Sequence, residues 1–235
     1  MNLVLLFPED FVAEARVRLQ GRRWAHVRQV HRVGVGDALR VGLLGGAMGI
    51  GKVRALDAEA LEMEVVLDQP PPPKLPLSLV LALPRPKVLN RVLASATSLG
   101  VARMALVNAW KVERAYWGSP KLEPDNLRRQ LLLGLEQSRD TVMPELSIGR
   151  LFRPFVEERL DAWAGPGTRL LAHPGAAETC PVGLPGGGVV AIGPEGGWID
   201  EERESLRRAG FREVDLGPRI LRVETALAAL VGRLC

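Results

Sequence analysis

The spacing of hydrophobic residues changes at a run of prolines. Before that run, Ala38–Val41, Gly49–Ala55 and Leu61–Leu67 are short apolar segments, and glycine-rich turns separate them. Two of the three alternate apolar and polar residues, which is typical of strands with one buried face. Several short strands at this spacing predict a small β-barrel or β-sandwich at the front of the chain.

The boundary itself is Gln69-Pro70-Pro71-Pro72-Pro73-Lys74. Consecutive prolines cannot donate to a sheet ladder or continue a helix, and they favour an extended, semi-rigid chain. We therefore predict a first domain over residues 1–68, a linker over 69–76 and a second domain over 77–235.

Beyond the linker, continuous apolar runs alternate with amphipathic ones. Leu77–Leu83 has the pattern of a buried strand, Val88–Leu99 that of a helix ended by Gly100, and Arg103–Val107 that of a second buried strand. This alternation predicts an α/β domain. The remaining predicted elements are helices at Pro124–Ser138, Pro154–Trp163, Asp200–Ala209 with Asp200 as N-cap, and Glu224–Leu234, and strands at Arg169–Ala172, Val189–Ile192 and Val214–Leu216.

Composition narrows the class of protein. The 235 residues are 47% hydrophobic and 25% charged, which is typical of a globular protein. No apolar run approaches the roughly 20 residues of a membrane span, and the N-terminus lacks a signal-peptide pattern, so we expect a cytoplasmic protein. Cys180 and Cys235 are far apart and there are three histidines, so we expect neither a disulfide framework nor a metal site.

Positive charge is concentrated near the N-terminus. Between residues 16 and 40 the only acid is Asp37, against seven arginines: Arg16, Arg18, Arg22, Arg23, Arg28, Arg32 and Arg40. Arginine suits bidentate phosphate contact and stacking on unpaired bases, so the segment favours a nucleic-acid partner. A solvated face in an arginine-rich protein is the alternative, because the chain uses 26 arginines and five lysines.

Two glycine-containing loops near the C-terminus are the candidate ligand site. Gly193–Gly197 and Leu216–Arg222 each follow a predicted strand and precede a predicted helix. Glycine permits close backbone approach, and a helix that begins after such a loop presents unpaired N–H groups. The first strand-to-helix turn, Leu83–Lys87, has no glycine, which argues against a dinucleotide-binding Rossmann site.

These loops carry a family resemblance. Ile192–Gly197 together with Leu216–Ala226 resembles the C-terminal signature of the RsmE family, SPOUT-class methyltransferases that methylate N3 of a uridine in small-subunit (16S) ribosomal RNA. Glu136–Arg139, and His26–Arg32 followed by Gly36-Asp37, are similar to other parts of the family, so the resemblance spans nearly the whole chain. Ser95 and Ser98 stand where the family usually has lysine and glutamate.

The resemblance implies a fold, a cofactor and partners. We expect a PUA-like β-barrel RNA-binding domain in front of a SPOUT domain with an α/β trefoil knot. We also expect S-adenosylmethionine as cofactor, small-subunit ribosomal RNA or the 30S subunit as substrate, and a homodimer.

Roles for individual residues follow from the resemblance and from the chemistry of the loops. Arg222 is the expected catalytic cation that stabilises the N3 anion, and Glu195 the carboxylate that orients it or takes the proton. A salt bridge from Arg222 to Glu195 or Glu224 that merely fixes the loop is the alternative for Arg222. The expected cofactor residues are His173, Gly193, Gly196, Gly197, Leu216, Gly217, Ile220 and Leu221, and the expected RNA residues are Arg22, Arg23, His26, Arg28, Arg32 and Arg139.

Two other functions stay open at the level of the sequence. One is a SPOUT ribose 2′-O-methyltransferase that acts on tRNA or rRNA. The other is a ribosome-binding factor that keeps the fold without turnover.

Overall fold

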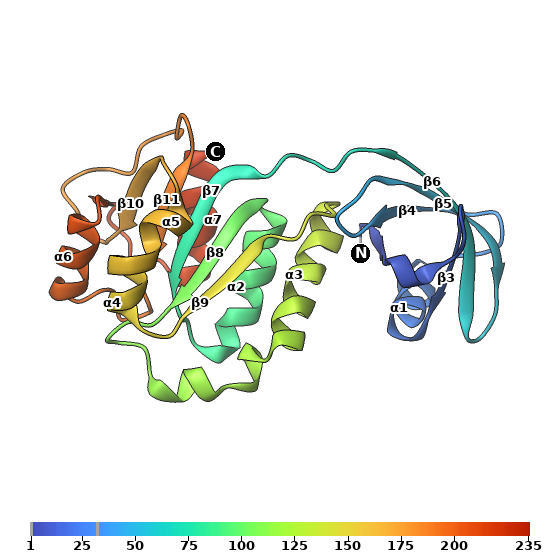
Figure 1. The fold of residues 1–235 in the computed structure, drawn as a ribbon, viewed down its shortest axis with the longest axis horizontal. Helices are drawn as coiled ribbons and strands as arrows, with labels where there is room; N and C mark the ends of the chain where they lie inside the picture. The colour runs from blue at the N-terminus through green and yellow to red at the C-terminus, as the bar shows by residue number, and fades with distance from the viewer. Residues whose placement is uncertain (1, 32) are drawn as a thin grey trace. The chain divides into compact units, whose positions relative to one another are not determined.

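The computed structural model describes residues 2–31 and 33–235, and within α1 the side chains of Arg22, Val30 and His31 are not described. The chain divides into two compact units (Figure 1). The first ends at Pro73 and also contains Leu132–Met143, whereas the second comprises Lys74–Leu131 and Pro144–Cys235.

The first unit is built on a mixed six-stranded sheet in the order β1-β4-β5-β6-β3-β2. β1 pairs with β4 in parallel, and the other neighbours pair antiparallel. The three strands predicted for this part of the chain are confirmed as β4, β5 and β6. The bounds are Val4–Leu6 (β1), Phe11–Ala13 (β2), Arg16–Gln20 (β3), Ala38–Leu43 (β4), Met48–Leu56 (β5) and Ala60–Gln69 (β6).

One helix, α1 (Gly21–His31), covers the core of this sheet. Trp24 and Val27, three positions apart on the helix, are buried in the same cluster as Leu19 and Met63 of the strands. The segment was read from the sequence only as an arginine-rich stretch. Its two apolar anchors were too few to reveal an amphipathic helix.

The C-terminal end of a long helix completes the first unit. α3 spans Pro124–Ser138, the same bounds as predicted. Its buried residues Leu132 and Leu135 pack against Leu3 and Leu5, and the Glu136 carbonyl accepts the backbone N–H of Leu3 at 3.1 Å. The first unit is therefore discontinuous in sequence, which no local pattern indicates.

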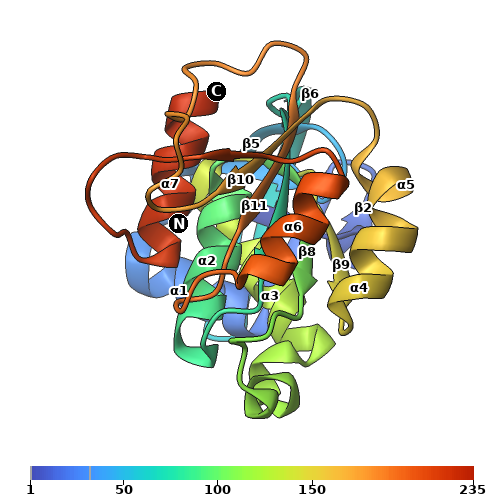
Figure 2. The ribbon, with the colours of Figure 1, turned by 90° about the vertical axis from the view of Figure 1, so that its left-hand side faces the viewer.

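The second unit is built on a six-stranded sheet in the order β12-β10-β11-β7-β8-β9, in which every pair is parallel (Figures 1 and 2). The strands are Leu75–Ala82 (β7), Val101–Val107 (β8), Glu145–Gly149 (β9), Thr168–Ala172 (β10), Gly188–Ile192 (β11) and Arg212–Val214 (β12). The helices are Pro86–Ser98 (α2), Phe152–Pro154 (α4), Leu160–Ala164 (α5), Asp200–Arg208 (α6) and Val223–Leu234 (α7), with a π-helical turn at Phe155–Arg159 between α4 and α5.

The α/β prediction is confirmed, with small displacements. The last strand ends at Val214 and not at Leu216. Asp200 is the first residue of α6 and not its N-cap, which is Ile199. The Glu202 carboxylate reaches back to accept the Ile199 N–H at 3.1 Å, so the helix start is satisfied from within the first turn.

The C-terminal segment is bonded to the connection between β10 and β11. The backbone of Asp215 pairs with Glu178 and Cys180, each at 2.8 Å. Further along, Arg233 of α7 donates from Nε to the Cys180 carbonyl at 2.6 Å and accepts from the Gly183 N–H at 2.8 Å. α7 buries its apolar face against α2 and β11, so this face belongs to the core of the unit.

The turn before β11 offers a matched test of this packing. Gly186 and Gly187 both have positive φ, 78° and 77°, but a Cβ on Gly187 would lie 2.2 Å from the Pro76 carbonyl oxygen, whereas one on Gly186 meets nothing within 4 Å. We expect Gly186→Ala to lower the free energy of unfolding by about 1–2 kcal/mol for the left-handed backbone alone. In urea unfolding, Gly187→Ala should lower the free energy of unfolding clearly more than Gly186→Ala does. Equal losses would contradict this account.

Candidate functional site

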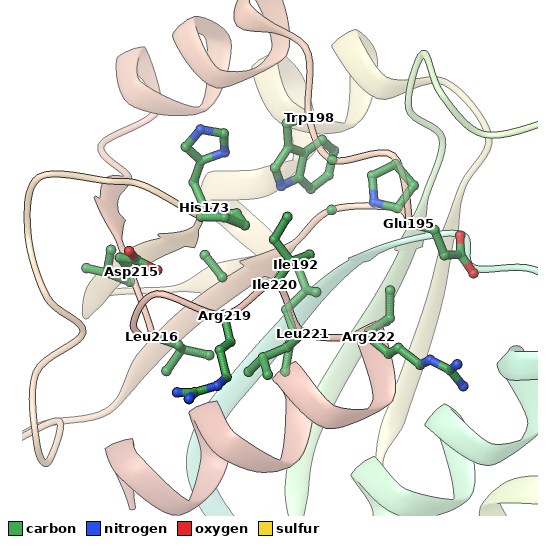
Figure 3. Close-up of a pocket in the computed structure, with 18 residues that line it drawn as sticks. His173, Ile192, Glu195, Trp198, Asp215, Leu216, Arg219, Ile220, Leu221 and Arg222 are labelled. Carbon is green, nitrogen blue, oxygen red and sulfur yellow. The ribbon is translucent and has the colours of Figure 1, made fainter.

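The site lies where three parallel strands end at the same level. Ala172 of β10 is in register with Ile192 of β11 and with Val214 of β12. The segments that leave these strands enclose a cavity of about 270 Å³, together with the loop before α7 (Figure 3). The carboxyl ends of parallel strands are the usual place for ligands in open α/β sheets.

Most of the residues predicted for the site line this cavity. They are His173, Gly193, Glu195, Gly197, Leu216, Ile220, Leu221 and Arg222. Gly196 and Gly217 do not line it. The Gly196 carbonyl accepts from Lys111 Nζ at 2.7 Å, and the Gly217 N–H donates to the Asp215 carboxylate at 3.2 Å, so both serve the shape of their loops.

Sequence reasoning missed part of the lining. The additional residues are Ala172, Pro174, Ile192, Pro194, Trp198, Val214, Asp215, Arg219, Val223 and Ala226. Three of them, Ala172, Ile192 and Val214, are strand ends. Parallel strands place their carboxyl ends at one edge of a sheet, so the predicted strands were enough to indicate these three residues. The others depend on how the two loops fold over each other, which no local signal records.

The imidazole in the cavity is predisposed to be neutral. Burial of His173, and secondarily the positive charge of Arg203, lower the pKa of its side chain. A neutral imidazole has one donor and one acceptor nitrogen, so His173 suits hydrogen bonding to a polar ligand.

The carboxylates near Arg222 have other partners. Glu195 accepts the Arg85 N–H at 3.1 Å and lies 3.9 Å from Arg85 Nε, and Glu224 lies 3.5 Å from Arg91. Among the described residues Arg222 makes no ion pair, so the proposed loop-fixing salt bridge is wrong. Figure 3 shows Glu195 and Arg222 on one side of the cavity and Arg219 pointing away from them.

A buried carboxylate that the sequence did not indicate joins one loop of the site to a neighbouring loop. Glu202 accepts the Trp110 N–H at 2.7 Å with one oxygen and the Ile199 N–H at 3.1 Å with the other. Burial raises the pKa of Glu202 despite these hydrogen bonds. Glu202 thereby ties the loop after β8 to the end of the Gly193–Gly197 loop.

The residues predicted to bind RNA lie in the first unit and differ in their surroundings. Arg23 is paired within the unit, with two nitrogens each 2.5 Å from an Asp10 oxygen and its guanidinium over the Phe7 ring. His26 and Arg28 are exposed on α1, and Arg139 is exposed after α3 with a φ of 58°. The side chain of Arg22, and Arg32 as a whole, lie outside the described residues.

Comparison with known proteins places this geometry in a family. The family model described as RNA methyltransferase domain matches residues 71–235. The ribosomal RNA small subunit methyltransferase E of Synechocystis is 30% identical over 95% of this chain and 73% of its own length, and that of Treponema pallidum is 29% identical over 97% and 88%. The chain belongs to the RsmE family of RNA methyltransferases.

Solved structures show the same fold. The RsmE of Neisseria gonorrhoeae, crystallised with S-adenosyl methionine, has a TM-score of 0.76 at 24% identity and covers 98% of this chain and 95% of its own. A Legionella pneumophila methyltransferase with bound SAM has a TM-score of 0.75 at 22% identity, and the match covers 98% of this chain and 96% of its own. The resemblance read from the two glycine loops of this RsmE-family chain is thus confirmed.

Within residues 2–31 and 33–235, no three side chains of histidine, cysteine, aspartate or glutamate are grouped so as to hold a metal ion. No helix of the described chain combines the length and apolar character that a bilayer span requires.

The raised pKa of Glu202 predicts how stability depends on pH. The folded chain retains this proton to a higher pH than the unfolded chain, so this contribution to stability falls as pH rises above about 4.3 through the raised pKa. Glu202→Gln removes the titrating group. We expect the difference in urea-unfolding free energy, wild type minus variant, to decrease from about pH 4 to about pH 7.

Glu204→Gln is the matched control, because Glu204 is an exposed acid on the same helix. Its difference from wild type should not follow the Glu202 profile. A pH-independent difference for Glu202→Gln would contradict the prediction.

Proposed function

We propose that this chain transfers the methyl group of S-adenosylmethionine to N3 of a uridine in small-subunit ribosomal RNA. The observation that carries the proposal is the cavity formed by the two glycine loops, with an unpaired arginine at its rim. Membership of the RsmE family, whose curated relatives bear the name ribosomal RNA small subunit methyltransferase E, supports the class of reaction.

The lining fits S-adenosylmethionine. Leu216, Ile220 and Leu221 supply apolar surface for a flat base, and the glycines of the other loop let backbone approach a ligand. The cofactor supplies an already activated methyl group on its sulfonium, so no metal is needed to activate it. The role of the chain is to hold the donor and to align the acceptor nitrogen with it.

The acceptor requires help because N3 of uridine carries a proton. We assign Arg222 to stabilise the negative charge that develops on the uracil ring as this proton leaves. Its guanidinium has no carboxylate to satisfy first, and a preorganised cation is most effective where charge develops. Glu195, held by Arg85 on the same side of the cavity, is our proposed acceptor of the proton.

Substitution of Arg222 tests this assignment. Arg222→Ala should lower the single-turnover rate by about a hundred- to a thousandfold, as for loss of one preorganised donor, while affinity for S-adenosylmethionine stays nearly unchanged. Higher pH should partly rescue the variant, because more of the uridine is already deprotonated.

Arg219→Ala provides the comparison, because Arg219 is in the same loop but points away from Glu195. Its rate should keep the pH profile of the wild type. Parallel profiles for Arg222→Ala and wild type, with a lower melting temperature for Arg222→Ala, would make Arg222 a structural residue.

The first unit is our proposed RNA-binding domain. We propose a PUA-like barrel over residues 1–68, to which Leu132–Met143 is added, with the 69–76 segment as linker and the rest of 77–235 as the SPOUT domain. Arg28 and Arg139 are exposed, and neither has an ion-pair partner among the described residues, so both are available to phosphate. We expect Arg23, paired with Asp10, to support this surface from within the unit. We expect His26, together with Arg22 and Arg32, to extend it.

Salt dependence of RNA binding tests this surface. Arg28→Ala and Arg139→Ala should each reduce the slope of log K against log salt by about 0.7 for single-stranded RNA. Arg54→Ala is the control, since Arg54 is exposed in the same unit but paired with Glu64. Equal slopes for all three variants and wild type would remove Arg28 and Arg139 from the interface.

The knot of the SPOUT fold is a further part of the proposal. We propose that Asp215–Cys235 passes through the connection over residues 173–187. The hydrogen bonds from this connection to Asp215 at one end and to Arg233 at the other support such a threading.

We also propose a cytoplasmic homodimer, on the strength of the family resemblance. Ile220, 86% exposed, and Val182, 81% exposed, are apolar side chains on the loops around the cavity that a second copy would cover. Light scattering of the full chain should give twice the monomer mass. A monomer that still transfers methyl groups would contradict the dimer.

The methylated RNA distinguishes the proposed N3 methylation from ribose 2′-O-methylation. Small subunits lacking the modification are incubated with labelled S-adenosylmethionine, and the RNA is then treated with alkali. A 2′-O-methyl group blocks cleavage at its nucleotide, whereas N3-methyluridine does not. RNA binding without any transfer of label would identify a non-catalytic ribosome-binding factor.

A further inference from the structure

Trp198 places a hydrogen-bond donor in the wall of the cavity. Its side chain is 4% exposed and lines the cavity, and no described protein group accepts from its Nε1–H. A buried indole N–H normally has a partner, since an unsatisfied donor is costly. Trp24 and Trp163 also have unpartnered Nε1 atoms, but neither borders this cavity.

The surroundings of Trp198 fix its ring and bury its indole nitrogen. The Phe152 ring packs against it, with centroids 5.8 Å apart. Gly193 lies next to the ring, since a Cβ there would come within 3.1 Å of Nε1. Because glycine has no Cβ, no side chain of residue 193 crowds this nitrogen. Figure 3 shows the nitrogen edge of the ring turned toward the interior.

Resting on the proposed function, we propose that Trp198 donates this hydrogen bond to the nucleoside half of S-adenosylmethionine. The charged methionine carboxylate is costly to bury and is better placed at the rim, where the lining is exposed to solvent. Adenine and ribose carry neutral acceptors and tolerate the buried wall. Trp198 is thus a cofactor-binding residue that adds a neutral donor to a largely apolar wall.

Binding of two ligands shows which half of the cofactor accepts the hydrogen bond from Trp198. S-adenosylhomocysteine has both halves of the cofactor, and 5′-methylthioadenosine lacks the amino-acid group. In Trp198→Phe, which keeps an aromatic ring, calorimetry should show both ligands bound about three- to tenfold more weakly, the effect of one net hydrogen bond. Trp163→Phe, which removes an unpartnered indole outside the cavity, should bind both as the wild type does.

A second measurement does not depend on a variant that folds. In the ¹⁵N–¹H spectrum of the wild-type chain, the Trp198 indole signal should shift downfield when methylthioadenosine is added, and the Trp163 signal should stay. Replacement of Trp198 by its benzothienyl analogue, which keeps the shape and lacks the N–H, should reproduce the loss seen with phenylalanine.

The outcomes are distinct. Unchanged affinity for both ligands in Trp198→Phe, or an indole signal that does not move, overturns the inference while leaving the proposed function intact. A loss confined to S-adenosylhomocysteine moves the acceptor to the amino-acid group and overturns the nucleoside assignment. If the wild-type chain binds neither ligand, the proposed cofactor itself is wrong.

Discussion

The site depends on the parallel register of β10, β11 and β12. Because Ala172, Ile192 and Val214 lie level with one another, the segments that follow them meet at one edge of the sheet. A slip of one residue in β11 would turn its side chains to the other face and move the Gly193–Gly197 loop along the edge. Buried apolar side chains on both faces of β11 and at Leu170 and Leu171 of β10 hold the register, whereas β12 adds only Val214 to the core.

The distribution of ion pairs around this edge is as important as the backbone. Glu224 lies two residues after Arg222 and Glu195 lines the cavity, and each is matched to a different arginine, Arg91 or Arg85, from the segment around α2. The pairs are partly exposed, so each contributes little to stability. Their consequence is electrostatic, because they leave the Arg222 guanidinium to interact with a ligand or substrate.

The same edge carries two kinds of hydrogen-bonding device. Glu202 is a buried acceptor that accepts the backbone N–H groups of Trp110 and Ile199, and so it holds their two loops together. Trp198 is a buried donor with no hydrogen-bond acceptor among the described residues. A rigid frame around an unsatisfied donor is the arrangement expected of a preformed binding site, in which little reorganisation is needed when the ligand arrives.

The sequence alone determined the class of fold, the order of most elements in the second unit and the two loops that form the site. Those features are local, because strand and helix periodicity and glycine-containing turns are written in neighbouring residues. Helix α1 and strand β9 were missed, since their short or arginine-rich segments carry weak periodicity. Only the tertiary structure decided that α3 ends in the first unit, that Gly196 faces Lys111 and that Arg23 is paired with Asp10. It also decided that Arg222 has no carboxylate partner within the described part of the chain. Each of these facts depends on which residues meet across long sequence separations, and single-sequence patterns do not encode such meetings.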